Sequence, residues 1–217
     1  MACPPEADPL RADRKILFSY LKSYNLIPQL MYLIIGLGNP GDEYNNTRHN
    51  IGREIAELFR KKYDLPDFRF EKKWNTEVTE GNIGKEKITI ALPNTFMNKS
   101  GAAAAALARY YKIKPATIIV IHDDADIPLG SAKLSFGKNS AGHKGVESII
   151  RAFKTNEFWR FRIGIAGKRN IPAEKIVLKK FTPDEKRLMI KISKKTIQAL
   201  EKALTEGPDR AMNEYNT

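Results

Sequence analysis

Three separated polar segments carry side chains that could form a hydrolytic site without a metal ion or a covalent nucleophile. His49 follows a short apolar run and the glycine-rich turn over 36–41, and it precedes a helix-like pattern. The segments 94–98 and 122–126 likewise follow apolar runs. A histidine can activate water, a carboxylate can fix the tautomer of that histidine, and amides can stabilise the developing oxyanion. The three segments therefore predict a hydrolytic site, provided that the fold brings them together.

The elements that must position these segments alternate between strand-like and helix-like patterns. Apolar and β-branched runs predict strands at 32–35, 75–83, 87–92, 117–121, 133–136 and 161–166. Apolar residues at helical spacing predict helices from 51, over 102–111, up to 153 and over 190–204. This alternation predicts one α/β domain, a mixed, mostly parallel twisted sheet flanked by helices on both faces. An α/β sheet binds ligands at the carboxyl ends of its strands, where the polar segments fall.

Some local details are expected as well. Leu58 and Ile190 should lie on the buried sides of their helices, because each fits an apolar stripe at helical spacing. Ser100 should be the N-cap of the helix over 102–111. The strand over 117–121 should end before His122, where the apolar run stops.

Composition and proline placement divide the chain into a short extension and one domain. The 217 residues, 42% of them hydrophobic, suffice for one domain with its own core. Three prolines break the first ten residues, and Pro28 would end a short helix expected over 14–26. Because Met31 directly precedes the first predicted strand, we expect an extension over 1–30 and a compact domain over 31–217. An alternative start at Met31 would leave out the extension, which we assign no function.

The net charge of +12 and the pI near 9.7 indicate an anionic partner, either nucleic acid or an acidic membrane surface. The alternative is a basic surface without such a partner. No apolar run approaches the roughly 18 residues that a membrane-spanning helix needs, and the N-terminus lacks a signal-peptide pattern. The single cysteine, Cys3, can form neither an intrachain disulfide nor a cysteine-based metal site. We expect a cytoplasmic protein without a membrane partner.

The glycine turn matches the GxGxxG dinucleotide fingerprint over 36–41, but its surroundings do not. That fingerprint requires the turn to open directly onto a helix, whereas Pro40 and a polar stretch delay the helix to about residue 49. A nicotinamide or flavin is therefore disfavoured, and no cofactor is expected. The competing chemistry is a metal site built from His49, His122 and the carboxylates of 123–126. Because these residues have no recognised zinc-ligand spacing, no metal is expected.

The segment 137–145, GKNSAGHKG, is a small-residue loop that runs into a predicted helix. Backbone N–H groups at a helix start bind phosphate well. The alternative is an ordinary turn between a strand and a helix. Lys133, Lys138 and Lys144 flank or interrupt the loop and favour phosphate. Arg162 could extend a basic face for a nucleic-acid backbone.

Five sequence blocks, taken in order, carry a family resemblance. They are GLGNPG with Tyr44 and TRHN within 36–50, NTFMNKSG at 94–101, HD with Asp126, Pro128 and Gly130, GH at 142–143, and RIGI at 162–165. From residue 31 to its end the chain resembles bacterial-type peptidyl-tRNA hydrolases. The resemblance implies a monomer that hydrolyses the ester between a nascent peptide and the 3′-terminal adenosine of tRNA, without metal or cofactor. The implied partner is the acceptor stem and CCA end of peptidyl-tRNA, and the implied role is ribosome rescue, with the tRNA freed for reuse.

The same resemblance implies roles for individual side chains. His49 is the implied catalytic base, and Asp123 is the carboxylate that orients it. Asn39 and Asn98 are implied to hold the substrate and to help stabilise the tetrahedral intermediate. Met97 is implied to form a wall of the site. The implied contacts to the peptide or the terminal nucleotides are Tyr44 and His143.

Two departures from the family pattern affect the loop over 137–145. Lys144 stands where the family has an asparagine that places water and substrate, and Ser135 replaces a basic residue. Lys133, Lys138 and Arg162 are therefore the expected phosphate contacts. Lys144 is also the one feature that favours an alternative, a paralogue that binds RNA with little or no turnover. Retention of all four residues implied in catalysis favours the enzyme, because a pure binder needs no oriented base.

Overall fold

The computed structural model describes residues 30–167 and 172–216. Contacts along the chain separate two units, Met1–Leu30 and Met31–Thr217, and the fold belongs to the second. The helix expected over 14–26 lies outside the described residues. None of the described helices is both long enough and apolar enough to cross a membrane.

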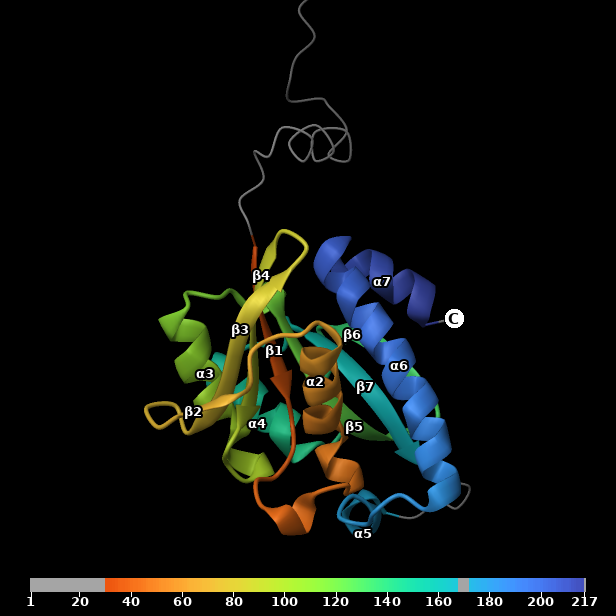
Figure 1. Cartoon of the computed structure of the whole chain (residues 1–217). Coiled ribbons are helices and arrows are strands. Elements are labelled where there is room, and N and C mark those ends of the chain that lie inside the picture. The colour runs from red at the N-terminus through yellow and green to blue at the C-terminus, as the bar shows by residue number, and fades with distance from the viewer. Residues whose placement is uncertain (1–29, 168–171, 217) are drawn as a thin grey trace, which may run out of the picture. The chain divides into compact units, whose positions relative to one another are not determined.

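One twisted sheet runs through the second unit, with seven strands in its described residues (Figure 1). They are β1 (Met31–Gly36), β2 (Arg69–Glu71), β3 (Thr76–Ile83), β4 (Glu86–Pro93), β5 (Ile118–Pro128), β6 (Ala132–Phe136) and β7 (Trp159–Ala166). Their order across the sheet is β2-β3-β4-β1-β5-β7-β6. The central strands β4, β1, β5 and β7 are parallel, whereas the pairs β2–β3, β3–β4 and β6–β7 are antiparallel. The predicted mixed sheet is confirmed, with its parallel part at the centre.

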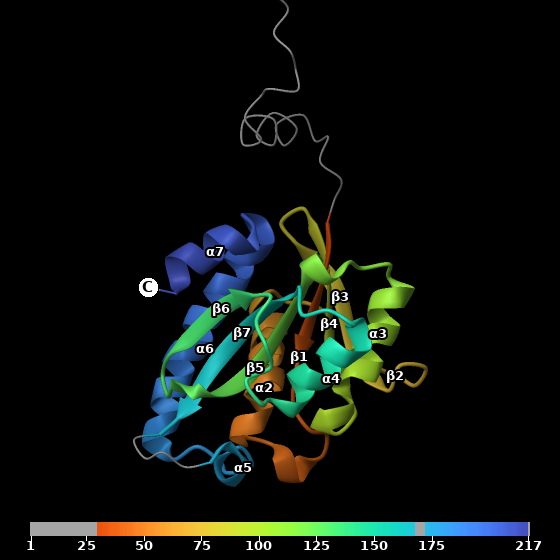
Figure 2. The same cartoon turned by 180° about the vertical axis from the view of Figure 1, so that it is seen from behind.

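Helices cover both faces of the sheet, as predicted (Figures 1 and 2). They are α2 (Ile51–Lys62), α3 (Ser100–Tyr110), α4 (Lys144–Phe153), α5 (Ala173–Ile176), α6 (Pro183–Thr205) and α7 (Pro208–Tyr215). α2 and α6 lie on one face of the sheet, and α3 and α4 lie on the other. Short 3-10 turns occupy Asp42–Tyr44, Arg48–Asn50, Met97–Lys99 and Pro115–Thr117.

Side chains of the central strands alternate between two apolar cores. Ile34 of β1 and Ile121 of β5 pack into the core formed with α2 and α6. Ile35 and Val120, one position along each strand, pack into the core formed with α3 and α4. All four side chains are fully buried. A strand covered on both faces needs a continuous apolar run, which is why β1 and β5 are recognisable in the sequence.

β5 extends further than predicted. It runs to Pro128, so His122 and Asp123 lie within the strand and not in a loop that follows it. The extension pairs with β7 in continuous register as far as Asp124, and the pairing resumes after a bulge at Pro128. A hydrophobic pattern ends this strand too early because its last residues are polar.

Three helix details also differ from prediction. Leu58 and Ile190 are exposed, at 45% and 58%, because the buried sides of α2 and α6 are narrower than the apolar pattern suggests. In α6 the neighbouring Met189 faces the core instead. α3 begins at Ser100 itself, whose hydroxyl donates to a carbonyl of the preceding turn, so Ser100 is not the N-cap.

Candidate active site

A glycine at the start of α2 brings His49 close to the sheet. His49 belongs to the 3-10 turn Arg48–Asn50, which leads directly into α2. A Cβ atom on Gly52 would lie 2.2 Å from the carbonyl oxygen of Ile121 and 2.7 Å from that of Leu37. Only glycine permits so close an approach of two backbones. Gly52 therefore sets how near the start of α2 lies to β5.

Backbone hydrogen bonds from a distant segment fix the main chain at His49. The His49 N–H donates to the carbonyl of Val177 over 2.8 Å, and the Arg48 N–H donates to that of Lys179 over 3.0 Å. The Arg48 guanidinium also donates to both carboxylate oxygens of Glu185 in α6, over 2.9 and 2.7 Å. No local pattern in the sequence indicates these supports, because their partners lie far along the chain.

The structure brings His49 and Asp123 into direct contact. Nδ1 of His49 lies 2.8 Å from Oδ1 of Asp123, and the two side chains are only 12% and 2% exposed. Burial alone would raise the pKa of the Asp123 carboxyl, but His143 and His49 hold that pKa far below its usual range. An ionised carboxylate only accepts hydrogen bonds, so Nδ1 of His49 carries the proton. Nε2 of His49 keeps its lone pair and can act as a base.

Asp123 accepts from a second histidine as well. Nε2 of His143 lies 2.9 Å from the same Oδ1 atom. Nδ1 of His143 accepts from the backbone N–H groups of Gly145 and Val146, over 3.1 and 3.2 Å. These bonds place the proton of His143 on Nε2. The two N–H groups that could meet a phosphate at the start of α4 are thus bonded to the protein's own imidazole.

The side chain and backbone of Asn39 are both held in place. Its Oδ1 accepts from the backbone N–H of Met97 over 2.8 Å. The Asn50 amide accepts from the Asn39 N–H and donates to the Asn39 carbonyl, each over 2.9 Å. Because the amide oxygen of Asn39 is occupied, its Nδ2 donors are what the side chain offers to a ligand. Such a donor can stabilise an oxyanion.

These side chains line a pocket of about 590 Å³. Residues singled out from the sequence that lie on its wall are Asn39, His49, Met97, Asn98, Asp123, His143 and Lys144. Wall residues that the sequence analysis did not single out include Phe96, Glu174, Val177 and Leu178. Phe96 and Leu178 are 58% and 54% exposed and give the pocket an apolar side. In the sequence, Phe96 lies in a noted block, but α5 and its flanks carry no signal of a site.

Comparison with known proteins decides the family. The family model described as peptidyl-tRNA hydrolase matches residues 33–217. This chain belongs to the peptidyl-tRNA hydrolase family. The peptidyl-tRNA hydrolase of Aquifex aeolicus is 40% identical over 189 residues, which cover 85% of this chain and 95% of that protein. The peptidyl-tRNA hydrolase of Dehalococcoides mccartyi is 42% identical over 192 residues, covering 86% of this chain and 100% of that protein.

Solved structures of the peptidyl-tRNA hydrolase family agree with the fold. The crystal structure of peptidyl-tRNA hydrolase from Acinetobacter baumannii superposes with a TM-score of 0.81 at 31% identity, covering 86% of this chain and 95% of that chain. The expected family, the α/β fold and the hydrolase class are confirmed. The alternative of an RNA-binding paralogue without turnover finds no support in these comparisons.

The remaining predicted substrate contacts lie outside the pocket wall of this peptidyl-tRNA hydrolase family member. Arg162 donates from Nε to Asp124 over 2.7 Å. Lys133 of β6 is exposed and lies opposite Arg162 in the register of β6 and β7. Lys138 is exposed in the loop that follows β6. Tyr44 lies in the 3-10 turn Asp42–Tyr44, which follows Gly41, and it does not line the pocket. The structure therefore gathers the basic residues on β6, β7 and the loop between β6 and α4.

His122 packs inward and does not line the pocket, although its ring lies against that of His143, with the two centroids 4.8 Å apart. It is 1% exposed, and its Nδ1 donates to the Asp123 carbonyl over 2.6 Å. Burial lowers the pKa of His122 well below its ordinary value, so the ring is neutral. Among the described residues, the group that could offer three metal ligands is His49, Asp123 and His143, whose ligand atoms lie within 4.8 Å of one another. The competing metal hypothesis thus loses His122 from its proposed ligands.

Proposed function

We propose that this chain hydrolyses peptidyl-tRNA at the ester between the peptide and the 3′-terminal adenosine. The observation that carries the proposal is the 2.8 Å hydrogen bond between His49 and Asp123, which leaves a basic nitrogen at the wall of the pocket. Membership of the peptidyl-tRNA hydrolase family supports the substrate. The products are a free peptide and a tRNA that can be used again.

The reaction needs one base, one water molecule and an oxyanion donor. Nε2 of His49 takes a proton from water as the water oxygen attacks the ester carbonyl. Asn39 Nδ2 and Asn98 donate to the oxygen of the tetrahedral intermediate. When the ester C–O bond breaks, the His49 imidazolium returns the proton to the leaving ribose oxygen. General-base assistance typically contributes about 10²–10⁴-fold, and an oxyanion donor about 10²–10³-fold.

The basic side chains give the tRNA a place beside the pocket. In this proposal Lys133, Lys138 and Arg162 contact phosphates of the acceptor stem, while Lys144 and His143 lie near the CCA end. The net charge of +12 supports a polyanionic partner. Met97 packs as a wall, and Tyr44 contacts the substrate outside the pocket. The proposal includes a monomer that works in the cytoplasm without a bound metal.

Hydrolysis of N-acetylaminoacyl-tRNA by the purified protein tests this function. Wild type should release the acetylated amino acid at the same rate with and without EDTA, and His49→Ala should lose about 10²–10⁴-fold in kcat. Robust turnover by His49→Ala would refute the mechanism. Activity that EDTA abolishes would favour a metal at His49, Asp123 and His143, and bound tRNA without turnover by wild type would favour an RNA-binding protein.

A further inference from the structure

A second hollow, of about 160 Å³, lies apart from the catalytic residues. Three aromatic side chains line it, Trp74, Tyr110 and Tyr111, and their ring centroids lie 4.9 to 5.8 Å apart. Tyr110 is 59% exposed. We call this hollow the aromatic groove. Trp74 and Tyr111 are half-buried and pack against the core on the side of α3 and α4. Aromatic side chains that reach the surface around a hollow are typical of binding surfaces.

The aromatic groove lies against the outermost strand of the sheet. Arg69 and Glu71 of β2 line it. β2 ends the strand order, so its outer edge pairs with no other strand in residues 30–167 and 172–216. Such an edge can bind an extended peptide through backbone hydrogen bonds. Because backbone hydrogen bonds do not depend on the identity of the side chains, the site suits a peptide of variable sequence.

The charges of the aromatic groove favour a peptide over RNA. Glu71 and Glu80 line it together with Arg69 and Lys73. Glu80 accepts a hydrogen bond of 2.5 Å from the Tyr111 hydroxyl, and the Lys73 ammonium already lies over two of the aromatic rings, at 3.9 and 4.5 Å. A surface that tracks a phosphate backbone needs an excess of cations. This groove instead balances its charges.

Hydrogen bonds connect the aromatic groove to one wall of the catalytic pocket. Asn75, next to Trp74, donates from its side chain to the Asn94 carbonyl, and its own carbonyl accepts from the Asn94 N–H, both over 2.9 Å. Asn94 begins the loop that carries Phe96, whose exposed ring lines the pocket. From the pocket the sheet continues on this side through β4 and β3 to β2. The proposed phosphate contacts lie on the other side, on β6 and β7.

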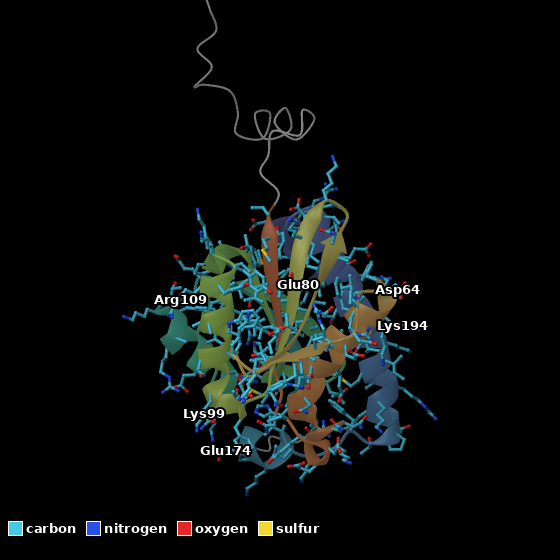
Figure 3. The ribbon with its side chains drawn as sticks, turned by 60° about the vertical axis from the view of Figure 1, so that its left-hand side comes forward. Asp64, Glu80, Lys99, Arg109, Glu174 and Lys194 are labelled. Atoms are coloured by element: carbon cyan, nitrogen blue, oxygen red, sulfur yellow. The ribbon has the colours of Figure 1, made fainter. Side chains whose placement is uncertain are left out.

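The length of α3 indicates how far the aromatic groove lies from the catalytic pocket. α3 starts at Ser100, next to the pocket, and ends at Tyr110 in the aromatic groove. Figure 3 shows Glu174, Lys99 and Arg109 in succession along this side of the molecule. A helix of 11 residues is about 16 Å long at about 1.5 Å per residue. An extended peptide rises about 3.3 Å per residue, so about five residues bridge the two sites.

We propose that the peptide carried by the substrate leaves the catalytic pocket past Phe96 and docks along β2, in the aromatic groove. This inference rests on the proposed function, since only a peptidyl substrate has a chain to place there. The peptide and the tRNA are attached to opposite sides of the ester carbonyl and must leave the pocket in different directions. In the proposed function the tRNA binds on the cationic side of the pocket. A peptide shorter than about five extended residues does not reach the groove.

The test compares two substrates made with the same tRNA. One is N-acetylaminoacyl-tRNA, and the other carries a peptide of about ten residues, long enough to reach the groove. For wild type, KM for the long substrate should be about tenfold lower, equivalent to about 1.4 kcal/mol. Tyr110→Ala should remove this advantage and leave kcat/KM for the short substrate unchanged. Ile190→Ala is the matched control, because Ile190 is 58% exposed on α6 and lies outside the groove.

Equal losses on both substrates would overturn the inference, because the groove would then contact the tRNA. No loss on either substrate would overturn it as well. Titration with the free peptide, followed by Trp74 fluorescence, tests the groove without hydrolysis, since the other tryptophan, Trp159, is 6% exposed. A saturable fluorescence change in wild type that Tyr110→Ala abolishes supports the groove. No change in wild type, or the same change in Tyr110→Ala, contradicts it. Failure of wild type to cleave the short substrate would refute the proposed function alone.

Discussion

Nε2 of His143 lies 2.9 Å from Oδ1 of Asp123. The same imidazole is the N-cap of α4, where its Nδ1 accepts from two backbone N–H groups. One ring therefore joins the start of α4 to the carboxylate that orients the proposed base. A displacement of the loop before α4 would move the His143 donor away from Asp123. It would thereby alter the carboxylate that orients His49.

Replacing His143 by alanine should therefore act on turnover. We expect kcat to fall about tenfold with KM changed less than about threefold, because the lost interaction positions a group and does not bind substrate. His143→Gln offers an N–H donor at similar reach and should recover part of the loss. Steady-state kinetics on N-acetylaminoacyl-tRNA measure both constants. A raised KM with unchanged kcat would instead make His143 a substrate contact.

Lys144 should contribute to tRNA affinity through its charge. It lines the pocket, and its Nζ lies 3.9 Å from Oε1 of Glu174 in α5. Lys144→Asn should weaken tRNA binding and reduce the slope of log K against log salt by about one. Lys194→Asn, at an exposed position on α6, is the control and should leave the slope unchanged. Identical slopes for wild type and Lys144→Asn would show that Lys144 does not touch a phosphate.

The buried His122 should make the protein less stable in mild acid. Burial lowers the pKa of His122 in the folded state, so below pH of about 6.5 the unfolded chain binds a proton that the folded chain does not. Stability is therefore lost as pH falls from this value, by up to about 1.4 kcal/mol per pH unit. His122→Gln, which keeps a donor for the Asp123 carbonyl, should flatten this dependence. Urea unfolding at pH 7.5 and 5.5 measures it, and equal pH dependence in both proteins would contradict the assignment.

The close approach at Gly52 predicts a selective effect of a single methyl group. Gly52→Ala would set a Cβ against the carbonyls of Ile121 and Leu37, so we expect a loss of about 1–3 kcal/mol of unfolding free energy and reduced activity as α2 moves His49. Gly167→Ala is the control, because a Cβ there meets none of the described residues within 4 Å. Urea unfolding of the two variants checks this. A Gly52→Ala protein as stable as the control would mean that α2 shifts freely.

The proximity of His49 and Asp123 could be predicted from the sequence. β1 and β5 are buried parallel strands, and their apolar runs mark them clearly. Adjacent parallel strands end at the same edge of a sheet, so polar residues that follow both runs must lie near each other. The same argument explains why the fold class could be predicted.

The supports of the site could not be read from the sequence. Backbone carbonyls of Val177 and Lys179 hold the His49 turn, and a backbone acceptor carries no signal in residue type. Arg48 and Glu185 are 137 positions apart, so no local pattern joins them. The partner of His143 depends on the path of its loop, in which Ala141 and Gly142 have φ of 50° and 75°. The sequence marks His143 as polar and near the site, but only this path aims it at Asp123.

In the proposed mechanism, Asp123 fixes the proton of His49 on Nδ1 and thereby leaves Nε2 as the base. The most direct measurement is the single-turnover rate of Asp123→Asn on N-acetylaminoacyl-tRNA, with tRNA affinity determined in parallel. We predict a rate about 10³–10⁴-fold below wild type, because an amide can stabilise the wrong tautomer, together with unchanged tRNA binding. A rate within about tenfold of wild type would contradict the account, since a base that needs no orienting carboxylate loses little when that carboxylate is removed.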